Sequence, residues 1–214
     1  MLMKRSHDLA PIEDASLVER ITSNYDSSLF IVGSHQKKRP NNLVMGRTFN
    51  GHVLDMFEFG VENYRGTSNF GSADFTNELK PILLFQGDVF DVSDKYKRIK
   101  NFFLDFFKIT ELSEVNIVEL KRVIVFTCRG ENCPIEFRHL EISDISESTV
   151  AKETIPFREV GPCFDLKIRR DKMATTELFK EACRTPKIRN IEKKRSDKNK
   201  YTTALGEKKA KVFL

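Results

Sequence analysis

The chain has 214 residues, of which 40% are hydrophobic and 31% charged, so it can form one domain or two small ones with a substantial core. Eighteen phenylalanines and no tryptophan predict a core built largely on phenylalanine rings. No apolar run approaches the ~20 residues that span a bilayer, and the polar start argues against a secretory signal. We therefore expect an intracellular protein that makes no membrane contact and keeps its four cysteines reduced.

The charge is distributed unevenly along the chain, although the formal net charge is only +5. From Arg184 to the end there are 11 basic and 3 acidic residues, whereas the preceding 183 residues hold 25 basic and 28 acidic ones. Clustered Lys and Arg bind polyanions because they release the counterions condensed on phosphates. The basic end therefore predicts a polyanion-binding arm, and the alternative is a solvated tail that only aids solubility.

The first fifty residues predict two short helices around one strand. Asp14 can cap a helix whose apolar positions follow directly, and the apolar run at 29–32 reads as a buried strand. A basic polar loop at 34–40 comes next. Residues 41–47 are then expected to form a short helix with Asn41 as its cap.

The next segment predicts two strands and a long helix. Residues 57–61 alternate between apolar and other residues, which is typical of a half-buried strand, and 81–85 form an apolar run typical of a buried one. Asp91 or Ser93 can cap a helix that continues to Lys108. Its apolar face repeats at helical spacing and comprises Tyr96, Ile99, Phe103 and Phe106.

A second strand–helix cycle is expected after residue 120. Strands at 123–128 and 135–142 form a hairpin around a polar turn, and a third strand alternates from Phe164 to Ile168. Thr175 or Thr176 can cap a short helix that Pro186 ends. Because strand–helix–strand material occurs twice, the pattern suggests two similar α/β halves.

The sequence carries no signature of a nucleotide-binding or hydrolytic enzyme. Gly33 and the basic residues after it resemble a phosphate-binding loop slightly, but the second glycine and the metal-binding hydroxyl are missing. Two interpretations remain for this segment, a basic surface loop and a nucleotide site, and we favour the first. We therefore expect no catalytic residue, no cofactor and no enzymatic activity.

A zinc site is the other chemistry that the residues suggest. Cys128 and Cys133 flank a turn, but a structural zinc ion needs two more ligands close in space. His139 on the returning strand is the nearby candidate for one of them. Unpaired thiols are the simpler interpretation, so we expect no bound metal.

Three basic clusters remain as candidate binding residues. The first follows the first strand and comprises Lys37, Lys38, Arg39 and Arg47. The second lies on the last strand and comprises Lys167, Arg169 and Arg170. The third is the tail, with Lys193, Lys194, Arg195, Lys198, Lys200, Lys208, Lys209 and Lys211. One cluster alone is typical of a solvated face, but three together favour binding to the phosphates of folded RNA.

Several ordered sequence blocks resemble the Brix-domain family. They include SLFIVGSHQKKRPNNLVMGR at 28–47, DMFEFGV at 55–61 and a strand and helix between Lys80 and Phe107. The block VGPCFDLKIRR at 160–170 is similar to the sigma-like motif of that family. The resemblance covers roughly residues 12–187, and the ordered set is far more specific than any one block.

The resemblance implies an α/β, Brix-type fold of two pseudo-repeated α/β halves packed as one unit, with a basic extended C-terminal tail. The corresponding boundaries are a lead-in at 1–27, a Brix domain at 28–187 with halves at about 28–110 and 115–187, and the tail at 188–214.

The resemblance also implies a non-catalytic role in ribosome assembly in the nucleolus. The implied partners are the regulator of ribosome synthesis as an obligate partner protein, 5S rRNA, large-subunit rRNA and the ribosomal proteins of the 5S ribonucleoprotein. Together with its partner, the chain is expected to recruit that particle into the large-subunit precursor. A protein-only nuclear adaptor, with Lys193, Lys194 and Arg195 as an import signal, is the alternative.

Overall fold

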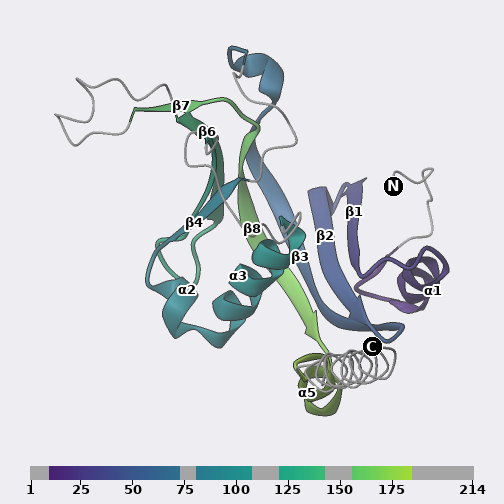
Figure 1. Ribbon diagram of the computed structural model, residues 1–214. Helices are drawn as coiled ribbons and strands as arrows, with labels where there is room; N and C mark the ends of the chain where they lie inside the picture. Colours follow the sequence, from purple (N-terminus) through teal and green to yellow (C-terminus); the bar gives the residue numbers. More distant parts are fainter. Residues whose placement is uncertain (1–9, 73–80, 108–120, 143–155, 185–214) are drawn as a thin grey trace, which may run out of the picture. The chain divides into compact units, whose positions relative to one another are not determined.

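The computed structural model describes residues 10–72, 81–107, 121–142 and 156–184 (Figure 1). The chain divides into two compact units, residues 1–174 and 175–214. No helix within the described ranges is long and apolar enough to cross a membrane.

The first unit is built on one eight-stranded sheet with helices against it, which confirms the predicted mixed α/β class (Figure 1). The strands are β1 (Leu29–Gln36), β2 (Arg39–Phe49), β3 (His52–Arg65), β4 (Ile82–Gln86), β5 (Arg122–Thr127), β6 (Ile135–Ile142), β7 (Phe157–Glu159) and β8 (Cys163–Met173). The helices are α1 (Ser16–Asn24), the 3-10 helix η1 (Thr67–Asn69), α2 (Val89–Val92) and α3 (Asp94–Phe106).

The strand order is β1-β2-β3-β8-β6-β5-β4, with β7 paired to β6. Only the β4–β5 pairing is parallel among the described strands. β8 comes late in the chain but lies between β3 and β6 and pairs with both, so it joins the two parts of the sheet. The division of this sheet into halves at 28–110 and 115–187 stays a prediction.

The main core is a phenylalanine cluster between α3 and one face of the sheet. Phe57 and Phe59 from β3 and Phe126 from β5 are fully buried there. Phe103 of α3 stacks on Phe126, with ring centroids 4.3 Å apart. The predictions of a long helix and of a phenylalanine core are thus confirmed, although this helix ends at Phe106.

The opposite face of β2 and β3 carries a second, smaller core that the N-terminal segment covers. Val44, Val53 and Met56 pack there with Ala15, just before α1. Both faces of these strands are therefore covered. The strand predicted at 57–61 is confirmed, but it is not half-buried as expected, because Glu58 on its second face is only 1% exposed.

The short helix predicted at 41–47 is wrong, because these residues lie within β2. Val44 packs in the smaller core and Met45 in the main core, so successive side chains point to opposite faces as they do in a strand. Gly46 is closely surrounded, since a Cβ there would lie 2.4 Å from the Phe30 ring and 2.8 Å from the Asp55 carbonyl oxygen. Pairing with β1 and β3 on both sides overrides the local helix signal.

Two of the predicted cap residues, Asp14 and Thr175, accept backbone hydrogen bonds at helix starts, whereas Ser93 precedes α3 without a side-chain cap. The Asp14 carboxylate accepts from the Ser16 N–H at 2.9 Å, where α1 begins. In the second unit, α5 (Thr176–Ala182) begins after Thr175, whose hydroxyl accepts from the Leu178 N–H at 3.4 Å. The expected stop at Pro186 lies outside the described residues.

Candidate nucleic-acid interface

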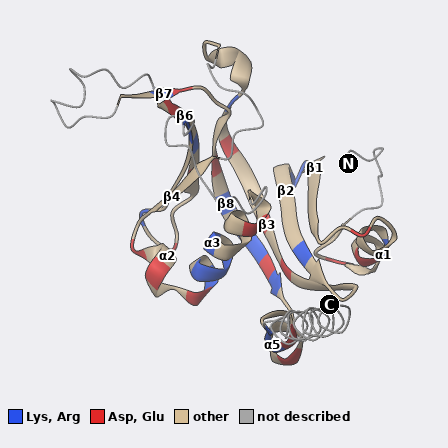
Figure 2. Ribbon diagram, in the orientation of Figure 1, with Lys and Arg blue, Asp and Glu red and all other residues tan. Residues whose placement is uncertain are grey.

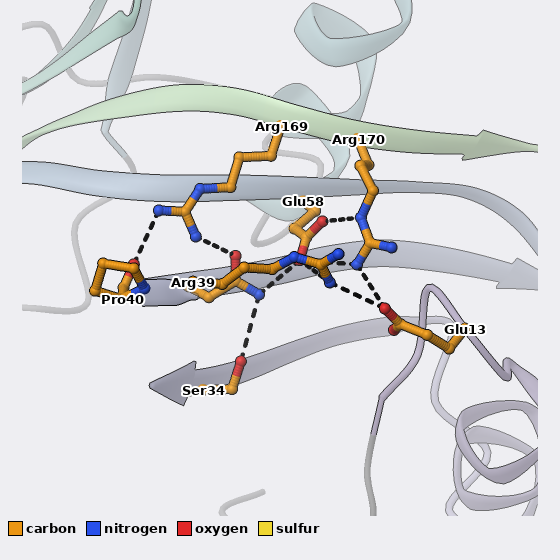
Figure 3. Close-up of polar contacts among 8 residues, drawn as sticks. Glu13, Ser34, Arg39, Pro40, Glu58, Arg169 and Arg170 are labelled. Carbon is orange, nitrogen blue, oxygen red and sulfur yellow. Dashed lines mark hydrogen bonds and ion pairs between the residues drawn. The ribbon is translucent and has the colours of Figure 1, made fainter. Parts of the chain in front are cut away.

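A β-bulge in β8 positions two neighbouring arginines on the same face of the sheet. Phe59 pairs with Ile168 and Glu58 pairs with Arg170, so Arg169 is the extra residue in β8. In a regular strand Arg169 and Arg170 would point to opposite faces. The bulge instead lets both side chains reach toward β2 and the N-terminal segment (Figure 3).

Glu58 is the buried anion beneath these arginines. Its carboxylate accepts hydrogen bonds from the Asn42 amide at 2.9 Å and from two guanidinium nitrogens of Arg170, Nε and Nη2. The hydrogen bond from Arg170 lowers the pKa of Glu58 below its ordinary value. A buried carboxylate needs such a partner to remain charged, so Arg170 stabilises the fold as well as contributing positive charge.

Glu13 bridges two arginines from different strands. Its Oε1 atom lies 2.9 Å from Nη1 of Arg39 on β2 and 2.8 Å from Nη2 of Arg170 on β8. Hydrogen bonds from Arg39, which has the larger effect, and from Arg170 lower the pKa of Glu13. These two contacts attach the N-terminal segment to β2 and β8 (Figure 3).

Arg169 lies across β3 and hydrogen-bonds to β2. It donates from Nη1 to the Asn42 side-chain oxygen at 2.8 Å and from Nη2 to the Pro40 carbonyl at 2.9 Å. Gly60 lies beneath it, and a Cβ there would come within 2.7 Å of the guanidinium. The absence of a side chain at Gly60 makes room for this arrangement.

We call this group the arginine cluster: Arg39, Arg169 and Arg170 with Glu13 and Glu58. Three positive groups face two negative ones, so the cluster has a net charge of +1.

Exposed lysines extend the arginine cluster in two directions. Lys37 and Lys38 are exposed and form the turn that joins β1 to β2, just before Arg39. Lys167 is exposed on β8, whose basic residues are blue in Figure 2. It lies opposite Gly60 of β3, and Gly60 lies opposite Asn42 of β2. Six of the seven basic residues predicted in the first two clusters therefore lie in the β1–β2 turn, at the start of β2, or on β8, and only β3 lies between β2 and β8.

Arg47 is the predicted residue that lies apart from this surface. It forms ion pairs with Asp55 and Asp105, and its guanidinium lies 5.9 Å from the Phe102 ring centre, against α3. Its side chain is 13% exposed. These contacts hold Arg47 between the sheet and α3. The predicted tail residues, from Lys193 to Lys211, lie outside the described residues.

The segment that resembled a phosphate loop is part of strand β1. Gly33 lies inside β1, no helix follows the next turn, and the Nδ1 atom of His35 accepts a hydrogen bond from the Asn41 N–H at 3.2 Å. A phosphate-binding loop needs a strand–loop–helix arrangement. This geometry does not support a nucleotide site.

His139, the candidate third zinc ligand, has both ring nitrogens engaged elsewhere. Nδ1 lies 2.6 Å from the Gly161 carbonyl oxygen, and Nε2 accepts from Arg122 at 3.0 Å. Burial lowers the pKa of His139. Cys128 and Cys133 are unpaired thiols, and the described part of the chain holds no cluster of three or more residues able to ligate a metal.

The acidic and amide partners of the arginine cluster were missed by sequence reasoning. Glu13, Asn42 and Glu58 lie far apart in the chain from Arg170, and no spacing links them. Glu58 was the one partner that the sequence could have indicated, because it is a charged residue between Phe57 and Phe59 in a predicted strand. Recognising that both faces of β3 are covered would have required a buried counterion for it.

Comparison with known proteins gives one family throughout. The model of the Brix domain matches residues 1–170. Ribosome production factor 2 homolog of Homo sapiens is 37% identical over 92% of this chain and 63% of its own length. The Drosophila melanogaster homolog is 34% identical over 100% of this chain and 65% of its length. Ribosome biogenesis protein RPF2 of Saccharomyces cerevisiae is 32% identical over 98% of this chain and 63% of its own length.

The chain thus spans somewhat less than two thirds of the length of these relatives. Among solved structures, a probable ribosomal biogenesis protein from Aeropyrum pernix K1 is similar with a TM-score of 0.42, at 10% identity over 75% of this chain and 78% of that chain.

Proposed function

Because the chain belongs to the Brix-domain family, we propose that it acts as a ribosome assembly factor of the large-subunit pathway and catalyses no reaction itself. In this proposal it binds rRNA and a partner protein and recruits the 5S ribonucleoprotein into the large-subunit precursor. The names of its relatives, ribosome production factor 2 and ribosome biogenesis protein, support a role in ribosome assembly. The observation that carries the RNA-binding part is the basic surface formed by the arginine cluster and its flanking lysines.

This surface suits phosphate recognition because it combines hydrogen-bonded arginines with exposed lysines. Arg39, Arg169 and Arg170 are held in defined orientations by their hydrogen bonds, and guanidinium groups recognise phosphate oxygens through paired N–H donors. Lys37 and Lys38 stand exposed at the β1–β2 turn, where they can follow the path of an RNA backbone. Recognition of shape and phosphates is the ordinary mode for folded RNA.

We infer that the chain pairs with the regulator of ribosome synthesis, binds 5S rRNA and large-subunit rRNA, contacts the ribosomal proteins of the 5S ribonucleoprotein, and works in the nucleolus. Residues 28–187 form the Brix domain in this scheme, and the tail at 188–214 is a second RNA-binding segment. Two modest contacts on one chain raise overall affinity through effective concentration.

The test is binding of the purified chain to 5S rRNA over a salt series. Each lost phosphate contact flattens the slope of log affinity against log salt by roughly 0.7–0.9. Replacing both Lys37 and Lys38 by alanine should therefore weaken binding and flatten the slope by about 1.4–1.8. The matched control replaces Lys95 and Lys97, which lie on α3 and pair with Asp171 and Asp94. Equal effects of the two double variants would argue against a localised RNA surface.

A protein-only adaptor is the second candidate, and one observation favours it. Within the described residues, the three arginines of the cluster are already engaged inside the chain, two by carboxylates and one by oxygens of β2. In that case Lys193, Lys194 and Arg195 act as an import signal. Tight binding to the partner protein, with no RNA affinity either alone or in the complex, would support the adaptor.

A further inference from the structure

We propose that Arg39 and Arg170 form an anion-binding site which the Glu13 carboxylate occupies in the unbound protein and which a backbone phosphate of RNA takes over on binding. The inference rests on the proposed function, because it assigns one phosphate position within that RNA surface.

The geometry of the site is that of an anion held by two guanidinium groups. Nη1 of Arg39 and Nη2 of Arg170 converge on the same oxygen atom, Oε1 of Glu13, from two different strands. A phosphate oxygen is recognised by the same donors at the same distances. The position of this carboxylate oxygen therefore marks where a phosphate oxygen can be bound (Figure 3).

The two glutamates of the arginine cluster differ in how readily they can leave. The Glu58 side chain is 1% exposed and hydrogen-bonded to both Asn42 and Arg170, so removing it would take an acceptor from two residues at once. The Glu13 side chain is 49% exposed and belongs to a short turn that precedes α1. Exposed ion pairs contribute little to stability, so Glu13 is the exchangeable anion and Glu58 the fixed one.

Departure of Glu13 changes the charge that the surface presents. The arginine cluster then has three positive groups and the single negative charge of Glu58, so its net charge rises from +1 to +2. Arg170 stays oriented because Glu58 still holds its Nε. Lys167 and the turn lysines continue the positive surface on either side. A phosphate thus meets two guanidinium groups. Arg170 keeps its hydrogen bond to Glu58 while it binds the phosphate.

The first experiment measures 5S rRNA binding by the full chain with Glu13→Gln. Glutamine keeps the size of the side chain but removes the competing charge, so we expect affinity to rise about threefold to tenfold and the salt slope to steepen by about one. Asp88→Asn is the matched control because it also removes one negative charge. Asp88 lies between β4 and α2, and β4 is the edge strand opposite β1. Equal tightening in both variants, or none in Glu13→Gln, would overturn the proposal.

A second experiment tests the site without RNA. Inorganic pyrophosphate should raise the melting temperature of Glu13→Gln more than that of the unaltered chain. Adding Arg39→Ala to that variant should abolish the difference. Arg39 is the residue to change because Arg170 also supports Glu58. Pyrophosphate stabilisation that is equal in all three proteins would contradict the site.

The two experiments separate the site from the proposed function. If no variant binds RNA but Glu13→Gln gains the pyrophosphate effect through Arg39, the anion site stands and the RNA-binding role fails. If the unaltered chain binds RNA but Glu13→Gln changes neither RNA nor pyrophosphate binding, the RNA-binding role stands and the site fails.

Discussion

Glu58 shows how one buried charge fixes the side chains around it. Its carboxylate is almost completely buried, and its partners come from β2 and β8, the strands on either side of it. Such a pair stabilises a fold little compared with an apolar alternative, but removing one partner is costly because the other is left unpaired. Arg170 is therefore more important for stability than its position on a basic surface suggests.

Arg170→Ala should destabilise the protein far more than Arg39→Ala. We expect a loss of roughly 2–4 kcal/mol for Arg170→Ala, because Glu58 keeps only the Asn42 amide and a more distant arginine. Arg39→Ala removes an exposed pair and should cost at most about 1 kcal/mol. Urea unfolding followed by circular dichroism measures both values. Similar losses would show that Glu58 does not depend on Arg170.

The lowered pKa of Glu58 predicts a contribution to acid sensitivity. The folded-state pKa lies below the ordinary value of 4.5, since Arg170 hydrogen-bonds to the charged form. The stability from this group is thus fully present above pH 4.5 and is lost as pH falls through the folded pKa. Melting temperature measured from pH 7 down to pH 3 should fall less steeply for Glu58→Gln than for the unaltered chain. Parallel curves would contradict this assignment.

At the scale of elements, the strand pairing of β1 and β2 depends on a position that has no room for a side chain. Gly46 faces the Phe30 ring on β1 and the Asp55 carbonyl on β3, whereas nothing lies within 4 Å of a Cβ built on Gly33. Both glycines are in paired strands, but only Gly33 has room for a Cβ atom.

Gly46→Ala should therefore cost about 1–3 kcal/mol through overpacking, while Gly33→Ala should change stability by less than about 0.5 kcal/mol. Chemical denaturation of the two variants gives the comparison. A tolerated alanine at Gly46 would mean that Phe30 moves aside without loss.

Periodicity in the sequence predicted most elements, but it could not predict how they cover one another. The α3 helix and the strand containing Phe126 followed from spacing alone. β2 was missed because Asn41 looks like a cap, and only pairing with strands on both sides makes residues 41–47 extended. The charges of Arg169 and Arg170 were visible in the sequence. Their common direction was not, because it depends on the register shift against β3.

At the scale of the molecule, two basic clusters that are separated by more than one hundred residues become one surface. Arg170 and Glu13 are 157 positions apart, and Arg169 and Asn42 are 127 apart, yet each pair is hydrogen-bonded. The link is the placement of β8 beside β3. Neither charge nor composition reveals such a junction, so the candidate interface could be predicted as residues but not as a site.

The placement of β8 also sets an order of events during synthesis. This strand is the last of the sheet to leave the ribosome, yet it fills the gap between β3 and β6. Contacts between distant segments form slowly, and domains fold as their last essential segment emerges. A nascent chain that has reached only residue 162 carries the turn lysines but neither arginine of β8. The basic surface is therefore completed only when β8 joins the sheet, so a nascent chain that lacks β8 cannot present it to RNA.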